Sequence, residues 1–258
     1  MAKFTTEDIQ KLYSSEAAKH KVAGTSTIQD MRTREMEVAA VALYLRDKQH
    51  ALEVGCGNGY VASRLVTQFD IDLEAFDFSP ALIGFAQQQD LSAARGRASF
   101  AVGDILSYAK QDAFDLVFSV RCLQNLVSWE DQKRGLRNVV AALKVGGEYI
   151  MEECFWTGLN NLNEARAELA LDPIPESWHN NFFHEPETIS FMESIGCRYV
   201  DQNPFLSGYY FGSRVLLPAL APKGKKITSG SRLNDYFAHL PPAGDFCPMK
   251  ILRFRRER

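Results

Sequence analysis

The sequence lacks the features that mark membrane proteins, secreted disulfide-rich domains and zinc fingers. It has no run of 18 apolar residues, so we expect no membrane-spanning helix. Its first residues lack the apolar core of a signal peptide, so we expect a cytoplasmic protein. No cysteines form a C-x-x-C pair, and we therefore expect free thiols and no metal site. The five cysteines are Cys56, Cys122, Cys154, Cys197 and Cys247.

The chain also lacks a strong charge of either sign. Its 29 Lys and Arg residues face 32 Asp and Glu residues, which gives a formal net charge of −3. Such a balance offers no general field for nucleic acid, so we expect no nucleic-acid or membrane partner. The basic tail 253–258 is short and is interpreted as a solvated strand end. The composition leaves the oligomeric state open.

The most informative feature present is a group of three alternating glycines. An apolar segment ending at Glu53 and Val54 leads into Gly55, Gly57 and Gly59. Glycine permits positive φ angles and lets the backbone approach a ligand, and such turns build nucleotide pockets at the carboxyl edge of parallel sheets. The dinucleotide fingerprint needs glycine at position 60, which is Tyr60, so a nicotinamide oxidoreductase is disfavoured.

Strand and helix patterns alternate through the first 155 residues. This order predicts an α/β fold with a doubly wound, mostly parallel sheet, a Rossmann-like arrangement. The predicted strands are 50–54, 72–77, 98–102, 114–120 and 148–154, followed by 198–205 and 249–254. The predicted helices are 5–20, 31–46, 60–69, one opening at Ser79-Pro80, 128–142 and 186–195.

The composition changes after residue 154, since nine of the ten prolines lie at Pro173 or later. Long segments between strands are usually functional or structured. We therefore predict four parts. They are an N-terminal lid (1–30), a core (31–155), a first cap insertion (156–184), and the end of the sheet (185–258), which carries a second cap insertion at about 206–247.

The pattern acid-x-G-x-G-x-G resembles motif I of the class I S-adenosylmethionine (SAM) dependent methyltransferases. The resemblance covers residues 31–155 best, and it implies a seven-stranded sheet with SAM as cofactor and S-adenosylhomocysteine (SAH) as product. In that family the glycine turn and the acid hold the methionine part of SAM. The implied cofactor contacts are Glu53, Gly55, Cys56, Gly57, Gly59, Asp77, Phe78, Ser79, Gly103, Asp104, Ile105, Ser119 and Arg121.

The resemblance gives several of these residues a role. Asp77 lies 22 residues after Gly55, where a ribose-binding carboxylate is expected. Phe78 would cover the adenine, and Asp104 would accept a hydrogen bond from the adenine amine. The segment that begins at Ser119 would run beneath the sulfonium.

Motifs of several acceptor classes are absent. No [DN]-P-P-[YF] motif follows the fourth strand, no Pro-Cys nucleophile occurs, and no cluster of Asp and Asn ligands is evident. We therefore expect O- or N-methylation of a small, anionic or sugar-like metabolite. His179, His184 and Glu152 are the candidate bases, because an alcohol or ammonium acceptor must lose a proton.

Arginines and aromatic residues provide the candidate acceptor contacts. Guanidinium groups bind carboxylates and phosphates in bidentate fashion. Surface ion pairs and core packing are the plainer explanations for these side chains. The candidates are Arg121, Arg166, Arg214, Trp178, Tyr209 and Tyr210.

Two rival functions stay open. The protein could be another SAM-dependent transferase or lyase, or a non-catalytic SAM-binding regulatory partner.

Overall fold

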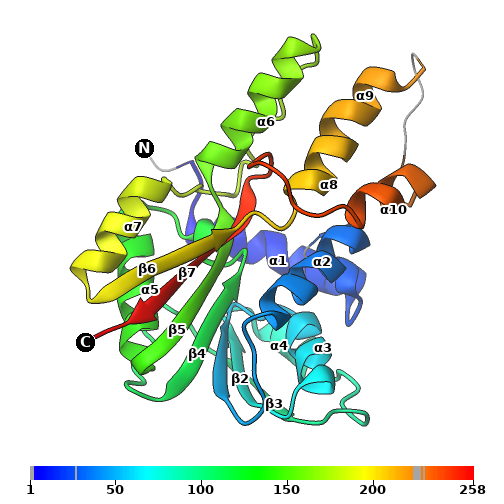
Figure 1. Cartoon of the computed structure of the whole chain (residues 1–258). Helices are drawn as coiled ribbons and strands as arrows, with labels where there is room; N and C mark the ends of the chain where they lie inside the picture. Colours follow the sequence, from blue (N-terminus) through cyan, green and yellow to red (C-terminus); the bar gives the residue numbers. More distant parts are fainter. Residues whose placement is uncertain (1–2, 27, 223–227, 229) are drawn as a thin grey trace.

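A computed structural model of the chain describes residues 3–26, 28–222, 228 and 230–258. The described strands form one seven-stranded sheet in the order β3-β2-β1-β4-β5-β7-β6 (Figure 1). The first five strands are parallel, and β7 runs antiparallel between β5 and β6. The strands are β1 His50–Val54, β2 Asp72–Asp77, β3 Arg97–Val102, β4 Phe114–Val120, β5 Leu143–Cys154, β6 Cys197–Asn203 and β7 Met249–Arg256.

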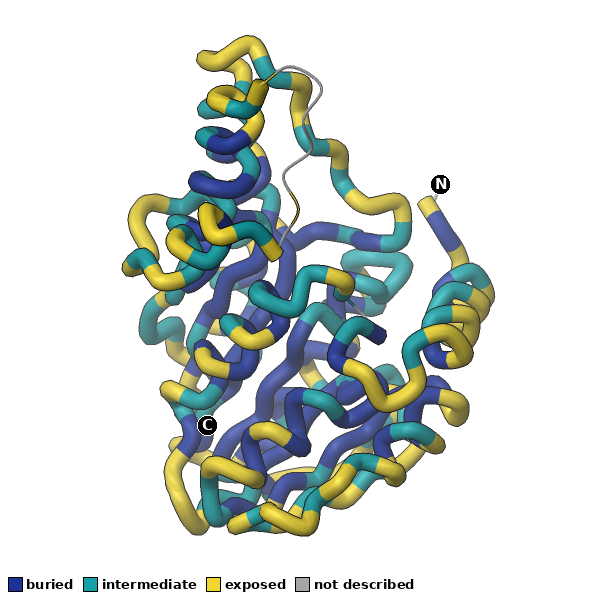
Figure 2. Tube along the Cα trace, turned by 90° about the vertical axis from the view of Figure 1, so that its right-hand side faces the viewer, coloured by how far each residue is buried: buried dark blue, intermediate teal, exposed yellow. Residues whose placement is uncertain are grey.

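The central strands are apolar because helices cover both faces of the sheet. On one face, Val41 of α2 and Leu65 of α3 pack with Phe118 of β4. On the other face, Leu136 of α5 packs with Val117. Figure 2 shows the sheet as a mostly buried band beneath helices with exposed outer sides. The core helices are α1 Thr6–His20, α2 Met31–Ala42, α3 Tyr60–Gln68, α4 Pro80–Ala86, α5 Trp129–Ala142 and α7 Glu185–Ser194.

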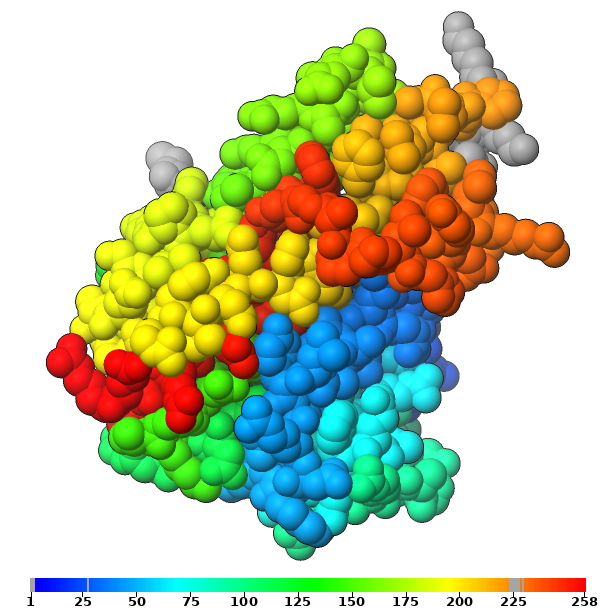
Figure 3. Space-filling model, viewed as in Figure 1, coloured from blue at the N-terminus to red at the C-terminus, as the bar shows by residue number. Residues whose placement is uncertain are grey.

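A second group of helices rises beyond the carboxyl edge of the parallel strands (Figure 1). These helices come from the two predicted cap insertions. They are α6 Trp156–Glu168, α8 Ser207–Phe211, the π-helical segment η3 Gly212–Leu216, α9 Leu217–Leu220 and α10 Arg232–Ala238. Arg32 of α2 pairs with Asp235 of α10, and Figure 3 shows the second insertion above the N-terminal region on this face. The cap is thus joined to the helix that follows the lid.

The predicted fold class is confirmed, and β1, β2 and β4 have the predicted bounds. The predicted start of β5 is wrong, because the strand begins at Leu143 instead of residue 148. Gly147 explains the difference, since a Cβ there would lie 3.1 Å from the carbonyl oxygens of Phe114 and Asp115. A glycine therefore lets β5 pass close to the start of β4, where the pairing register shifts.

Parts of two predicted segments lie outside the described residues. These parts are 1–2 and 27 of the lid and 223–227 and 229 of the second cap insertion. Among the described helices, none is both long and apolar enough to cross a membrane.

Candidate active site

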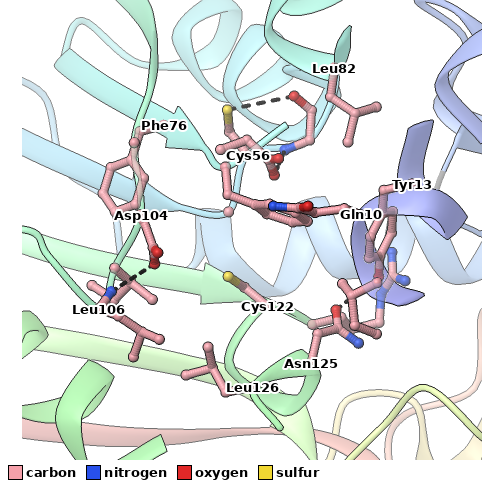
Figure 4. A pocket seen from close by; sticks show the side chains of 18 of the residues that line it. Gln10, Tyr13, Cys56, Phe76, Leu82, Asp104, Leu106, Cys122, Asn125 and Leu126 are labelled. Atoms are coloured by element: carbon pink, nitrogen blue, oxygen red, sulfur yellow. Dashed lines mark hydrogen bonds between the residues drawn. The ribbon is translucent and has the colours of Figure 1, made fainter. Parts of the chain in front are cut away.

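A cavity of about 370 Å³ lies at the carboxyl ends of β1, β2 and β4. Helix α1 covers it, with Ile9, Gln10 and Tyr13 in the cavity wall. Figure 4 shows Asp104 and Leu106 at one end and Tyr13 and Asn125 at the other. The size suits a ligand larger than a simple metabolite, since ligand pockets begin at about 300 Å³.

The glycine turn forms one wall of this cavity. Gly55 and Gly57 have φ angles of 75° and 54°. A Cβ on Gly55 would lie 2.2 Å from the Cys122 Sγ atom, so no other residue fits there without a shift of β4. Cys56 also lines the cavity. The turn thus exposes main-chain atoms to the ligand.

Asp77 lies at the end of β2, beside the glycine turn. One carboxylate oxygen accepts a hydrogen bond from the Gly57 amide at 2.9 Å, and the other accepts from the Ser79 amide at 2.9 Å. Burial raises its pKa to about 6, although these hydrogen bonds oppose the shift. Each oxygen keeps a further lone pair, so Asp77 can still accept from a pair of ribose hydroxyls.

Two ionisable side chains without full hydrogen bonding line the same cavity. Glu53 is 1% exposed, and its Oε2 atom has no hydrogen-bond partner. Burial raises the pKa of Glu53 to about 8, and the nearby Arg34 opposes this rise. Arg34 is 4% exposed, and its Nε atom also has no partner. Sequence reasoning missed Arg34, because its helix α2 precedes the motif and carries no signature.

The far end of the cavity forms an apolar slot with one acid. Phe78, Ile105 and Leu126 line it, and Tyr13 meets Phe78 edge-on with ring centroids 6.4 Å apart. Asp104 accepts a hydrogen bond from the Leu106 amide at 2.9 Å. A flat aromatic base with an exocyclic amine matches this combination.

Three predicted cofactor contacts do not line the cavity. Gly59 is the N-cap of α3, where a Cβ would lie 2.9 Å from Phe100. Ser79 caps α4. Ser119 lies beneath the wall and donates to Glu153 at 2.7 Å. These three residues support the cavity wall from behind. The other ten predicted contacts all line the cavity. The ten are Glu53, Gly55, Cys56, Gly57, Asp77, Phe78, Gly103, Asp104, Ile105 and Arg121.

Arg121 lies where β4 ends and belongs to the cavity wall. Its φ angle is 53°, an unusual value for a residue with a side chain. The Nε atom donates to Glu37 of α2 at 2.7 Å, and a second nitrogen donates at 3.3 Å. Arg34 pairs with the same Glu37 at 3.1 Å. Glu37 therefore holds both guanidinium groups at the cavity.

The two acids that end β5 have opposite surroundings. Glu153 accepts hydrogen bonds from the amides of Cys122, Leu123 and Gln124, at 3.0–3.2 Å. It therefore organises the turn that carries the cavity wall after β4. Glu152 is fully buried, yet neither of its carboxyl oxygens has a hydrogen-bond partner. Burial, reinforced by Glu37, raises its pKa well above the ordinary value.

His179 lies behind Asn125, outside the cavity wall. The Asn125 side-chain amide donates to the His179 carbonyl at 3.0 Å and joins the first insertion to the site. The imidazole Nδ1 atom is buried without a partner. Burial and the charge of Arg121 lower the pKa of His179. The imidazole is therefore neutral near pH 7, as a proton acceptor requires.

The two residues predicted beside His179 lie further from the site. Trp178 is 55% exposed and meets Phe4 edge-on. His184 is exposed at the N-cap of α7 and lies near the ring of Trp156. Neither residue contacts the cavity.

The remaining acceptor candidates gather in the cap. The Tyr209 hydroxyl donates to Asp30 at 2.8 Å, and Arg214 approaches the same carboxylate at 3.5 Å. Arg214 also lies over the ring of Tyr210. Arg166 donates to the main-chain carbonyls of Asp172 and Arg214. These side chains connect α6, α8 and η3 to the start of α2, and none of them lines the cavity.

The comparisons with known proteins find methyltransferases. A family model described as a methyltransferase domain matches residues 51–147, from the glycine motif to the start of β5. Residues 51–147 therefore match a methyltransferase domain, as the resemblance of the glycine motif to the class I SAM-dependent methyltransferases predicts. A solved structure, the magnesium protoporphyrin IX methyltransferase of Synechocystis with bound SAH, covers 98% of this chain and all of its own. The TM-score is 0.64 at 14% sequence identity, which shows a shared fold.

Curated methyltransferases resemble parts of the chain. Ajmaline N-methyltransferase of Rauvolfia serpentina is 34% identical over 40% of this chain and 35% of its own length. A ubiquinone biosynthesis O-methyltransferase of Coxiella burnetii is 28% identical over 59% of this chain and 65% of its own length. The chain thus spans between about one third and two thirds of these relatives. The family-model match at residues 51–147 includes the glycine turn and excludes the cap insertions.

Proposed function

We propose that this protein transfers a methyl group from SAM to a nitrogen or oxygen atom of a small acceptor. One observation carries the proposal. A buried carboxylate oxygen of Glu53 and a buried nitrogen of Arg34 both lack partners within a cavity that also has a ribose-type carboxylate, Asp77. The methionine end of SAM carries one ammonium and one carboxylate, so it supplies a partner for each.

The cavity suits the other parts of SAM in the order in which they are joined. Main-chain atoms of Gly55 and Gly57 border the methionine end, and Asp77 stands at the ribose position. Phe78 and Asp104 belong to the slot that would hold adenine. Dinucleotides lack an amino-acid group, and would leave the Glu53 and Arg34 atoms unsatisfied, at a cost of about 1–3 kcal/mol for each buried group.

The sulfonium of SAM supplies an already activated methyl group, so the protein mainly provides proximity and orientation. Arg121 and Cys122 also line the cavity. Glu37 holds Arg121 in place. His179 is one candidate to take the proton that the acceptor loses, because its Nδ1 atom is buried, unpartnered and kept neutral by its surroundings, but it lies outside the cavity wall.

A binding experiment with two matched ligands tests the proposal. SAH carries the amino-acid end, whereas 5′-methylthioadenosine lacks it. We expect Arg34→Met to weaken the binding of SAH by about 10- to 100-fold, as for a lost charged hydrogen bond. The binding of methylthioadenosine should not change. Arg97→Met on β3, which removes an exposed ion pair with Asp72, is the matched control. Equal effects of Arg34→Met on both ligands would remove Arg34 from the amino-acid site.

A further inference from the structure

The three arginines predicted to bind an anionic acceptor already have partners within the described part of the chain. Arg121 is paired with Glu37, and Arg214 with Asp30. Arg166 is held by two main-chain carbonyls. An anionic acceptor would have to displace these contacts. The expectation of an anionic acceptor therefore finds no support in the geometry of these three side chains.

The unsatisfied group on this side is an acid. In the described part of the chain, Glu152 has a carboxyl group with both oxygens buried and unpartnered. Side chains alternate between the faces of a strand, so Glu152 shares the face of Ile150 and Cys154. That face packs against α2 and α8, because both of these neighbours belong to the core cluster that contains Val38 and Tyr209.

Glu152 does not itself line the cavity, but other groups surround it next to the cavity residues Val120 and Arg121. Val120, a cavity residue, is paired with Glu152 across β4 and β5, and the Arg121 amide donates to the Glu152 carbonyl at 2.8 Å. Glu37 and Arg121 are its strongest charged neighbours. Burial raises the pKa of the Tyr210 hydroxyl group on α8, and Glu37 and Cys154 are close enough for their charges to raise it further. Glu152 is thus placed between the methyl-transfer region and the cap.

An ionised Glu152 needs a cation beside it, and a cationic ligand would supply one. Glu37 offsets one of its two guanidinium partners, and the methionine carboxylate proposed above offsets the other. An ionised Glu152 then has no counter-charge among its named neighbours. A buried carboxylate is costly without a paired charge or donors, so its partner has to come from the ligand.

We propose that Glu152 anchors the protonated amine of the methyl acceptor and takes one of its protons before transfer, so that the nitrogen has a lone pair for the methyl group; the acceptor is then an amine rather than an anion. The inference rests on the proposed function, because it assumes SAM in the neighbouring cavity. A primary or secondary ammonium group offers two or three donors, which matches two carboxyl oxygens without partners. The cap would enclose the rest of the acceptor.

A series of probes with different charges tests this inference. Phenylalkylamines with chains of two to four carbons are compared with the matching alcohols and carboxylates, each titrated into the SAH-bound protein by calorimetry. We expect the amines to bind at least 10-fold more tightly than either uncharged or anionic counterparts. Glu152→Gln should reduce amine binding at least 10-fold and leave the alcohols unchanged. Glu148→Gln, on the same strand and paired with Arg253 at the sheet, is the control.

The possible outcomes separate the two proposals. If SAH itself fails to bind, the proposed function fails. Two outcomes with SAH bound would overturn the inference about the acceptor. In the first, the carboxylates or alcohols have the same affinity as the amines, and in the second, no amine binds. Unchanged amine binding in a folded, SAH-binding Glu152→Gln variant also overturns it, and leaves Glu152 with a bound water as its partner.

Discussion

The cofactor side and the acceptor side of the site differ in how their side chains are brought together. On the cofactor side, Glu53, Gly55 and Gly57 come from one short segment at the end of β1. On the acceptor side, Glu37 comes from α2 and Glu152 from β5, and His179 belongs to the first insertion. The first side is built by a local turn, whereas the second depends on packing between distant elements. A change in the cap can therefore alter the acceptor and leave the cofactor turn intact.

The largest effect is expected on the cofactor side, from Gly55→Ala. The new Cβ would overlap the Cys122 Sγ atom, and the φ angle of 75° disfavours any side chain. Left-handed geometry alone costs about 1–3 kcal/mol, so we expect SAH binding to fall by about 5- to 150-fold. Calorimetry with SAH measures the loss. Gly84→Ala on α4 is the control, because a Cβ there has no neighbour within 4 Å. Equal binding by both variants would show that the turn does not contact SAH.

The next comparison uses the adjacent acids of β5. Glu153→Gln replaces an acceptor oxygen with an amide that faces the N–H group of Gln124. We expect a loss of about 1–3 kcal/mol in the free energy of unfolding, because a buried donor becomes unsatisfied. Glu152→Gln breaks no hydrogen bond of the structure and should change stability by less than about 1 kcal/mol. Denaturant unfolding at pH 7 measures both. A larger loss in Glu152→Gln would mean that Glu152 has a structural role.

A smaller effect is expected at His179, and it depends on pH. The folded pKa lies below the ordinary value of about 6.5, because burial and Arg121 disfavour the charged ring. Between the folded and unfolded pKa values the unfolded chain binds more protons, so stability falls as the pH drops below about 6.5. An NMR titration of the imidazole, assigned with His179→Gln, measures the folded value. Titration at or above 6.5 would remove the case for a neutral His179 base at neutral pH.

Most of the cofactor contacts predicted from the sequence line the cavity, because the physical causes of that part are local. Positive φ angles require glycine at positions 55 and 57, and the spacing to Asp77 follows from one strand, one helix and the next strand. The acid Glu53 and the apolar Phe78 follow from the same motif. Gly59, Ser79 and Ser119 belong to the same turns, yet only the three-dimensional arrangement shows that they lie behind the cavity wall.

The acceptor side cannot be predicted in the same way. Nothing near Glu37 indicates that α2 would place it beside β4 and β5. Arg34 of the same helix, on the cofactor side, carries no sequence signature either. The sequence allows Arg166 and Arg214 to bind an anion, but the cap packing gives them partners within the chain. The alternation along β5 predicts that Glu152 and Glu153 face opposite sides. It does not show that one has several donors and the other has none.

Proton release on SAH binding tests the central claim most directly. Burial gives Glu53 a pKa of about 8 in the free protein, so it is mostly protonated at pH 7. An ammonium group placed beside it favours the carboxylate, and binding should therefore release up to about one proton. Calorimetry at pH 7 in buffers of different ionisation enthalpy measures this number, and Glu53→Gln should bring it close to zero. Binding without proton release in the unmodified protein, or no heat in any buffer, would contradict an amino-acid site at Glu53.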